Sequence, residues 1–384
     1  MATMNNKKKK TGRPLSKKEQ QKRKMMIIGA EVVCLLVLLA VVLVWSFVGK
    51  INFNSFSEED AGINADLSAE SKEILEGYTN VAFFGLDNRD GGSYRSGQSD
   101  VIMIASINNE TKEVKLVSVY RDTYLHIGDD LYKKANSAYA KGGPARAVQM
   151  LNSNLDLNIT EYVCVDFMAL VEVVDALGGV EIEITEQEMK IINDSLWELE
   201  EISGETYDMF DYLWGSGLQT LTGPQATAYA RIRSTAGDDF KRTSRQRIVL
   251  EAILDKAKQS DMSTLLDICE VVFDDISTSL SLTEIMDLAK DVKSYSIVST
   301  SGFPFDMTTA TISGNGSCVI PISLENNVSQ LYAYLFGAEG YVCSETVQFT
   351  SDYITEVTGV KLGDSSINTD GYNDTAGQDG TVFD

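Results

Sequence analysis

Residues 81–107, VAFFGLDNRDGGSYRSGQSDVIMIASI, place two apolar runs on either side of a polar, glycine-rich loop. The first run, Val81–Leu86, predicts a strand that is buried on both faces, and Val101–Ile107 predicts a second strand. The turn-forming residues 108–110 separate the second strand from a third, Glu113–Tyr120. We therefore expect the second and third strands to pair as a hairpin.

The pattern after these strands alternates helices with strands. Pro144 suits the first turn of a helix that ends near Leu155, and Tyr162–Val165 predicts the next strand. Asp166 is a suitable N-cap for a further helix, and Val180–Ile184 predicts a strand after it. This alternation predicts the α/β class, as an α/β/α sandwich whose central mixed β-sheet is covered by helices on both faces.

Two N-terminal segments predict a membrane anchor. Residues 1–24 hold ten Lys or Arg and one acid, and residues 25–48 are apolar except for Glu31. A bilayer span needs about 20 apolar residues, whereas the apolar region of a cleaved signal peptide has only about 7–15. We therefore predict a signal-anchor helix, with the basic segment in the cytoplasm and the rest of the chain outside the cell.

The chain divides into five predicted parts. They are a cytoplasmic basic tail (1–24), a transmembrane helix (25–48), an extracellular stalk (49–77), an extracellular folded domain (78–350, with its motifs in 80–258) and an acidic, disordered tail (351–384). From Gly363 onward the tail contains no base and is rich in small polar residues, a composition that does not build an apolar core.

The composition excludes several classes of function. After residue 48 the chain holds 23 bases and 54 acids, a net charge of −31 that repels nucleic acid. His126 is the only histidine, which excludes zinc sites built on several histidines and leaves a Ser-His-Asp triad with one poorly placed candidate. Cys318 and Cys343 could pair outside the cell, but five sparse cysteines are no disulfide framework and are better interpreted as small hydrophobic residues.

One basic run stands out in the acidic body of the chain. Residues 229–247 contain six bases, Arg231, Arg233, Lys241, Arg242, Arg245 and Arg247. The planar guanidinium group suits phosphate oxygens, and Arg242 and Gln246 share a helix face at i, i+4 spacing. The alternative is a solvated helix whose arginines pair with nearby acids.

Carboxylates at two predicted strand ends suggest a metal site. Asp87 and Asp100 flank the glycine-rich loop, and oxygen ligands without a nearby histidine suit Mg²⁺, which also bridges to phosphates. The alternative is a pair of ordinary turn residues. Arg121 and Asp122 end the third strand, where Arg121 is either a structural partner of Asp122 or a further phosphate ligand.

Together these residues resemble the LytR-CpsA-Psr family of cell-wall transferases. The match runs in one order from Asn80 to Lys258, nearly half of the chain. It consists of Phe84-Gly85-Leu86-Asp87-Asn88-Arg89, Ser99-Asp100, Ser118-x-Tyr120-Arg121-Asp122-Thr123, Lys134-x-Asn136-Ser137-Ala138, Asp166-Phe167, Leu177-Gly178-Gly179-Val180, Leu221-Thr222-Gly223-x-Gln225-Ala226, Tyr229-Ala230-Arg231-x-Arg233 and Asp239-Phe240-x-Arg242-x-x-Arg245-Gln246.

Two positions depart from the family's pattern. The family often has Arg where this chain has Gln98, which removes a phosphate contact that Arg95 could replace or leave open. It often has Pro where this chain has Tyr120, a difference that we expect to change only the edge of the strand.

The resemblance implies a transferase with an apolar groove for a polyprenyl chain. Asp87 and Asp100 would hold Mg²⁺ on the lipid pyrophosphate, and six residues would grip its oxygens: Arg89, Arg121, Arg231, Arg233, Arg242 and Gln246. A peptidoglycan hydroxyl would then attack, and polyprenyl phosphate would leave. Arg121, Asp122 and Arg231 are the catalytic candidates, with Asp122 acting as the general base or orienting Arg121.

Three alternative functions remain open at this level. The same residues could hydrolyse the lipid pyrophosphate with water, or the domain could bind a lipid-linked glycan without turnover. A membrane-bound transcription regulator ranks last, because the cytoplasmic segment of about two dozen residues is too short for a DNA-binding fold.

Overall fold

The computed structural model describes residues 52–53, 58–86, 97–203, 206, 211–233, 238–261, 263–265, 268 and 276–367. The described residues all belong to one compact unit. The predicted cytoplasmic tail and the predicted membrane helix lie outside the described residues. None of the helices within the described ranges is both long and apolar enough to cross a bilayer.

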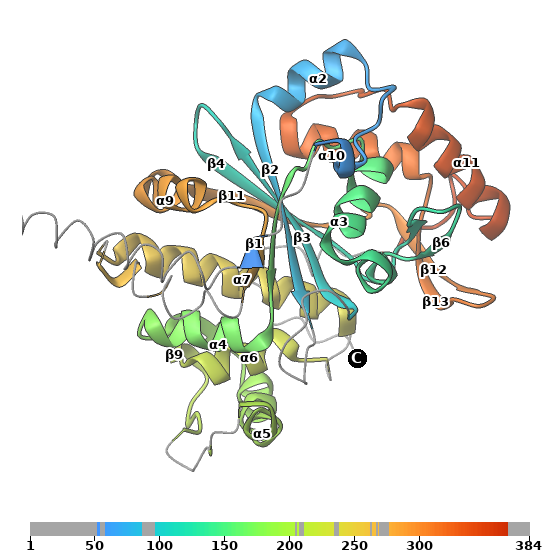
Figure 1. Ribbon diagram of the computed structural model, residues 1–384. Coiled ribbons are helices and arrows are strands. Elements are labelled where there is room, and N and C mark those ends of the chain that lie inside the picture. The colour runs from blue at the N-terminus through green and yellow to red at the C-terminus, as the bar shows by residue number, and fades with distance from the viewer. Residues whose placement is uncertain are drawn as a thin grey trace, which may run out of the picture. The chain divides into compact units, whose positions relative to one another are not determined.

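A seven-stranded mixed sheet forms the centre of the fold, in the order β1-β10-β7-β2-β3-β4-β11 (Figure 1). Its strands are β1 (Asn52–Phe53), β2 (Tyr78–Leu86), β3 (Ser99–Asn108), β4 (Glu113–Val119), β7 (Glu161–Val165), β10 (Ile276–Thr278) and β11 (Ser296–Phe303). Strands β2, β3 and β4 are antiparallel neighbours, whereas β7 runs parallel to β2 and β11 runs parallel to β4. The predicted hairpin and the predicted mixed sheet are confirmed.

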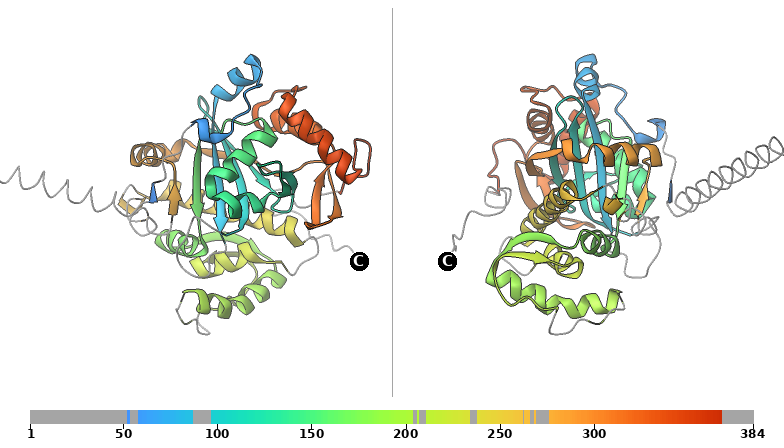
Figure 2. Two further views of the ribbon diagram at one scale, coloured as in Figure 1. Left: turned by 45° about the vertical axis from the view of Figure 1, so that its right-hand side comes forward. Right: turned by 90° about the vertical axis from the view of Figure 1, so that its left-hand side faces the viewer.

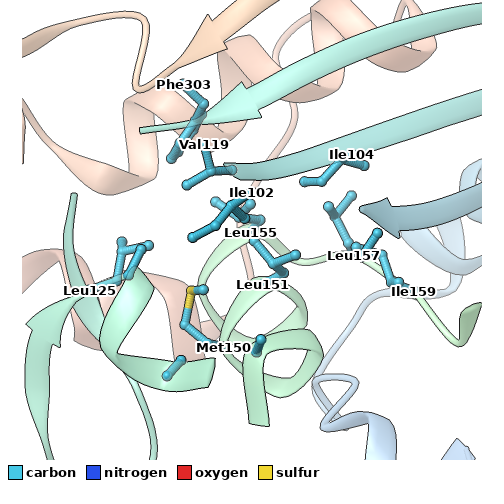
Figure 3. Packing of buried hydrophobic residues seen from close by; sticks show 14 of the residues in the cluster. Ile102, Ile104, Val119, Leu125, Met150, Leu151, Leu155, Leu157, Ile159 and Phe303 are labelled. Atoms are coloured by element: carbon cyan, nitrogen blue, oxygen red, sulfur yellow. The ribbon is translucent and has the colours of Figure 1, made fainter. Parts of the chain in front are cut away.

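Both faces of the sheet are apolar because the strand residues alternate between two cores. Ile102 and Ile104 of β3 belong to one core, and Met103 and Ala105 between them belong to the other. This is the period of two that a strand imposes. In Figure 3 the side chains of Ile102 and Ile104 face Leu151 of the helix that covers the first core.

Four helices pack on the side of the first core: α2 (Ala69–Glu76), α3 (Asn136–Leu155), α10 (Leu324–Phe336) and α11 (Glu345–Thr358). Helix α3 is kinked, because Gly142 and Gly143 have non-helical backbone angles and Gly143 has a φ of 65°. Pro144 follows the kink and begins the second segment of α3. The helix predicted from Pro144 is therefore this second segment, and the first begins eight residues earlier.

The other face is covered by α7 (Asp238–Gln259), which packs against β4 and β11. Beyond it a small lobe has its own apolar core, built from α4 (Phe167–Ala176), β8 (Val180–Ile184), α5 (Glu186–Ser203), β9 (Gly217–Leu221) and α6 (Gly223–Arg231). Asp166 caps α4 through a bond from the Ala169 N–H, as predicted. The predicted strand at 180–184 forms, and it pairs with β9 in a separate two-stranded sheet.

The remaining elements lie at the edges of the sandwich. They are η1 (Glu58–Ala61), β5 (Tyr124–His126), β6 (Tyr132–Lys134), α9 (Leu282–Lys290), η3 (Val292–Ser294), β12 (Met307–Ile312) and β13 (Gly316–Pro321). The two views of Figure 2 show the sheet between its helix layers. Strands β12 and β13 form a hairpin, and an isolated bridge between Thr123 and Val319 joins it to the segment before β5.

The folded part extends beyond both boundaries that we expected. Leu67 and Leu75, in the predicted stalk, are buried in the first core. In the predicted tail, α11 continues to Thr358, Ile354 is 1% exposed, and the Ile367 N–H donates to the Met307 carbonyl at 2.8 Å. Both segments are polar overall, and a few well-spaced apolar residues anchor them. Residues 368–384 lie outside the described part of the chain.

The structure contains no disulfide between Cys318 and Cys343, because both are free thiols. Both are buried in the first core, and burial raises their pKa values. Burial also raises the pKa of Cys164 to about 12. These three cysteines therefore act as small apolar residues, as the sequence indicated.

Candidate functional site

A tight turn after β4 presents Arg121 and Asp122. The Tyr120 carbonyl accepts from the Thr123 N–H at 2.9 Å and from the Thr123 hydroxyl at 2.7 Å. The turn is held from two more sides, because the Arg121 carbonyl accepts from the Asn136 N–H at 3.0 Å and the Asp122 carbonyl accepts from the Val319 N–H at 2.9 Å. The start of α3 and strand β13 thus fix the backbone that carries both side chains.

Tyr120 is buried next to this turn and supports it. This corrects our expectation that tyrosine in place of proline changes only the edge of the strand. It is 2% exposed and its ring meets that of Phe240 edge-on, with centroids 4.7 Å apart. Its N–H donates to the Phe303 carbonyl at 3.0 Å, a bond that proline has no hydrogen to form. Tyr120 therefore ties the turn to α7 and to β11.

Three arginines converge on the carboxylate of Asp100. Arg121 Nη1 lies 2.7 Å from Asp100 Oδ1, and Arg233 Nη2 lies 2.7 Å from Asp100 Oδ2. Arg242 Nη1 is 3.6 Å from the same Oδ2, and its Nη2 is 3.4 Å from the Asp100 carbonyl oxygen. Charge-assisted contacts of this kind are short and directional.

The members of this arginine cluster (Arg121, Arg233 and Arg242 around Asp100) come from separate parts of the chain. Asp100 is in β3, Arg121 is in the turn after β4, Arg233 follows α6, and Arg242 is in the first turns of α7. Arg242 is 2% exposed, whereas the Arg233 side chain is 51% exposed. The cluster therefore has a fixed, buried base and an accessible rim, where an anionic group of a ligand can be gripped.

Other bases of the 229–247 run have different roles. Arg231 lies over the ring of Phe167, 4.7 Å from its centroid. Arg245 Nε donates to Glu188 Oε1 at 2.8 Å and so links α7 to α5. Arg247 is buried at 2% exposure, and burial lowers its pKa. The α7 part of the run is not a solvated face, because Arg242, Arg245 and Arg247 are buried. The pairing with acids that this alternative expected does occur, at Arg233, Arg242 and Arg245.

Several predicted site residues are not placed by these contacts. Asp87 and Arg89 lie outside the described residues. Gln246 is half-buried on α7, one turn beyond Arg242. Within the described ranges no group of three or more His, Cys, Asp or Glu residues is arranged to hold a metal ion. The Mg²⁺ site on Asp87 and Asp100 therefore stays a prediction.

A polar pocket of about 380 Å³ adjoins the cluster through Arg121 and Asp122. Asp122 forms one of its walls, with Oδ1 at 3.0 Å from Lys134 Nζ and Oδ2 at 4.0 Å from Arg121 Nε. The pocket is lined by Gln98, Arg121, Asp122, Lys133, Lys134, Asn136, Ser137, Gly314 and Asn315.

Lys133, Gly314 and Asn315 of this pocket were not among the residues predicted from the sequence. Lys134 and Asn136 appeared in a motif without a role. Gly314 and Asn315, in the turn between β12 and β13, follow the motif-bearing segment, and no local signal there points to a ligand. His126 contributes to neither the cluster nor the pocket. It is half-buried beside Tyr132, and burial lowers its pKa.

Comparison with known proteins shows the family of the chain. The LytR_cpsA_psr family model matches residues 49–330. The chain is 32% identical over 217 residues to the polyisoprenyl-teichoic acid–peptidoglycan teichoic acid transferase TagU of Enterococcus faecalis, an alignment that covers 56% of this chain and 65% of that one. It is also 32% identical to TagU of Bacillus subtilis, over 56% of this chain and 63% of the relative. The chain thus spans slightly less than two thirds of the length of these two relatives.

The fold is also that of solved structures. Protein gbs0355 from Streptococcus agalactiae superposes with a TM-score of 0.59 and 22% identity, over 75% of this chain and 97% of that one. At this identity the likeness concerns the fold alone. The family match, in contrast, covers well over half of the sequence. The chain belongs to the LytR_cpsA_psr family.

Proposed function

We propose that this protein transfers a glycopolymer from a polyprenyl-pyrophosphate carrier to a hydroxyl group of peptidoglycan. The observation that supports this most is the convergence of Arg121, Arg233 and Arg242 on Asp100. Three guanidinium groups from three segments, with one of them at the solvent-exposed rim, suit a ligand with several phosphate oxygens. The TagU relatives are named for this type of transfer.

In the proposed reaction the arginines hold the pyrophosphate and stabilise the charge that develops on its oxygens. The acceptor hydroxyl attacks the phosphorus that carries the glycan, and the bond to polyprenyl phosphate breaks. Positioning and charge stabilisation supply most of the catalysis in phosphoryl transfer. Asp122 lies next to Arg121 and is the candidate to accept the proton of the hydroxyl.

We propose that a Mg²⁺ ion binds together with the pyrophosphate. Both oxygens of Asp100 contact arginines in this structure, so an ion on Asp100 would have to displace at least one of these contacts. Asp87 and Asp100 would hold this ion, which when bound would neutralise charge on the pyrophosphate oxygens. Arg89, Arg231 and Gln246 are further proposed ligands of the pyrophosphate.

The proposed location follows from the N-terminal sequence. A signal-anchor helix at 25–48 would hold the chain in the cell membrane with residues 49–384 outside. The catalytic domain would then meet both its membrane-borne donor and the wall. An apolar groove for the polyprenyl chain remains part of the proposal.

The test uses the purified full-length chain in detergent, with a polyprenyl-pyrophosphate-linked oligosaccharide and peptidoglycan fragments, with and without Mg²⁺. We expect Mg²⁺-dependent release of polyprenyl phosphate, with the oligosaccharide joined to peptidoglycan. Asp87→Ala and Arg231→Ala should abolish transfer and leave the domain folded. Release of free sugar phosphate would instead indicate a hydrolase, and binding without turnover would indicate a non-catalytic module.

A further inference from the structure

In the polar pocket beside the arginine cluster, Lys133 forms no ion pair with any residue that the structure describes. Its Nζ lies 3.4 Å from the amide oxygen of Asn315. Lys134, its neighbour in β6, is paired with Asp122 at 3.0 Å. Lys133 is therefore available to an anionic group in the pocket.

Asn136 provides a second, independent sign of a ligand. This side chain is 4% exposed, and its amide oxygen has no hydrogen-bond donor within the described ranges, although its amide nitrogen reaches Gln98 Oε1 at 3.5 Å. A buried carbonyl oxygen without a donor is costly. The oxygen is itself enclosed, so the Asn136 side chain would have to turn toward the pocket to accept from a hydroxyl or N–H group of a ligand there.

The position of Asp122 determines which substrate the pocket suits. Its carboxylate lies between Lys134 on the pocket side and Arg121 on the side of the arginine cluster. A hydroxyl group placed in the pocket against Asp122 would therefore lie close to a phosphorus atom held by Arg121. The glycan of the donor needs no such base, whereas the attacking hydroxyl does.

We infer that this pocket binds the acceptor, a peptidoglycan sugar unit that carries an anionic peptide. The inference rests on the proposed transferase function and assigns it a second subsite. Lys133 binds a peptide carboxylate, and Asn136 accepts a hydrogen bond from a hydroxyl or acetamido group of the sugar. The attacking hydroxyl oxygen forms a bond to the glycan-linked phosphorus, its proton passes to Asp122, and polyprenyl phosphate departs with the electrons of the broken P–O bond.

The β12–β13 hairpin gives this subsite its specificity. Asn315 is in the turn of the hairpin and lines the pocket. The hairpin is also the element that fixes Asp122, through the bond from the Val319 N–H to the Asp122 carbonyl. Acceptor recognition and the placement of the proposed base therefore depend on the same hairpin.

The test compares Lys133→Ala with the wild-type full-length protein, varying the donor and a peptidoglycan disaccharide-peptide independently. We expect the KM for the disaccharide-peptide to rise about tenfold, because one hydrogen bond to a charged group is lost. The KM for the lipid donor should change less than twofold. Lys190→Ala is the matched control, because Lys190 is an exposed residue of α5 with a Glu186 partner at 2.7 Å.

Further results decide whether the pocket binds the acceptor or the donor. A chitin tetrasaccharide, which lacks carboxylates, should inhibit the wild type and Lys133→Ala equally. If the donor KM rises in place of the acceptor KM, or if neither changes, the inference is wrong. If the wild type does not transfer at all, the proposed function fails, and calorimetric binding of the disaccharide-peptide still tests the pocket. A tenfold weaker Kd for Lys133→Ala then supports it, and an unchanged Kd overturns it.

Discussion

Two carboxylates of this protein, Asp100 and Asp156, are surrounded in contrasting ways. Asp100 is contacted by three arginines, one of them largely exposed. Asp156 is 0% exposed, and its donors in the described part of the chain are all neutral: Asn64 at 2.7 Å, the Ser344 N–H at 2.8 Å, the Ser344 hydroxyl at 2.6 Å and the Tyr341 hydroxyl at 3.1 Å. The Tyr332 hydroxyl also donates to its backbone carbonyl.

The difference separates a binding site from a structural junction. Short neutral side chains around Asp156 satisfy it fully, and they join the segment before α2 to the C-terminus of α3 and the start of α11. At Asp100 the exposed Arg233 side chain can turn toward a ligand, while the buried Arg242 keeps its place. A buried carboxylate therefore indicates function here only when its partners are charged and can be reached from solvent.

The largest effect should come from removing a guanidinium group from the arginine cluster. We expect Arg121→Ala to lower the transfer rate about 10³-fold or more, the range that a single arginine contributes in phosphoryl-transfer enzymes. The thermal midpoint should change little, because backbone bonds hold the turn and Asp100 keeps Arg233 and Arg242 as partners. Steady-state transfer kinetics and calorimetry measure the two quantities.

Arg146→Ala is the matched control for this prediction. Its side chain is 18% exposed and pairs with Asp129 at 2.6 Å, but it belongs to neither the arginine cluster nor the pocket. We expect transfer within threefold of the wild type. An equal loss of transfer rate in both variants would mean that Arg121 supports the fold and does not contact the substrate. The distinction between Asp100 as a binding site and Asp156 as a structural junction would then fail.

The second effect concerns stability alone. Asp156→Ala leaves several buried donors without an acceptor, and we expect the free energy of unfolding to fall by about 3 kcal/mol or more. Arg233→Ala, at the exposed rim of the cluster, should change it by less than about 1 kcal/mol. Denaturant titration measures both. A smaller loss for Asp156→Ala than for Arg233→Ala would reverse our interpretation of the two sites.

Local sequence signals predicted much of the fold. The strands at 81–86 and 113–120, the hairpin between the second and third strands, and the cap at Asp166 all depend on patterns within a few residues. Arg233 and Arg242 were predicted to share a site from their motifs, and the structure brings both to Asp100. The order of the motifs was the informative signal. No spacing rule predicts that Arg242 contacts Asp100, which lies 142 positions earlier in the sequence.

Features that depend on distant contacts were not predictable. Asn315 reaches the pocket only because β13 pairs with the segment at Thr123, almost two hundred residues earlier. The polar residues after 350 looked like a tail because α11 is held by few apolar side chains, such as Val347 and Ile354. Tyr120 occupies a position where the family often has proline, and only the packed structure shows what its ring touches.

The smallest of the three effects tests how the turn that carries Arg121 is supported. A Cβ atom on Gly302 would overlap the hydroxyl group and the ring of Tyr120. We expect Gly302→Ala to cost about 1–3 kcal/mol of stability, the usual range for overpacking. Gly215→Ala is the control, since the nearest atom to its added Cβ is a Gln219 side-chain nitrogen at 3.8 Å.

A double mutant shows whether the cost of Gly302→Ala comes from the overlap with Tyr120 or from any side chain at this position of β11. Tyr120→Ala opens space beneath Gly302, so the two substitutions together should cost less than the sum of their separate costs by about 1 kcal/mol or more. Additive costs would show that Tyr120 yields to the new methyl group without strain. If the two costs are not additive and Gly302→Ala also lowers the transfer rate, a change in the packing of β11 affects the arginine cluster through Tyr120. The structural and functional regions are then joined at this one residue, because the turn that presents Arg121 begins where Tyr120 is packed.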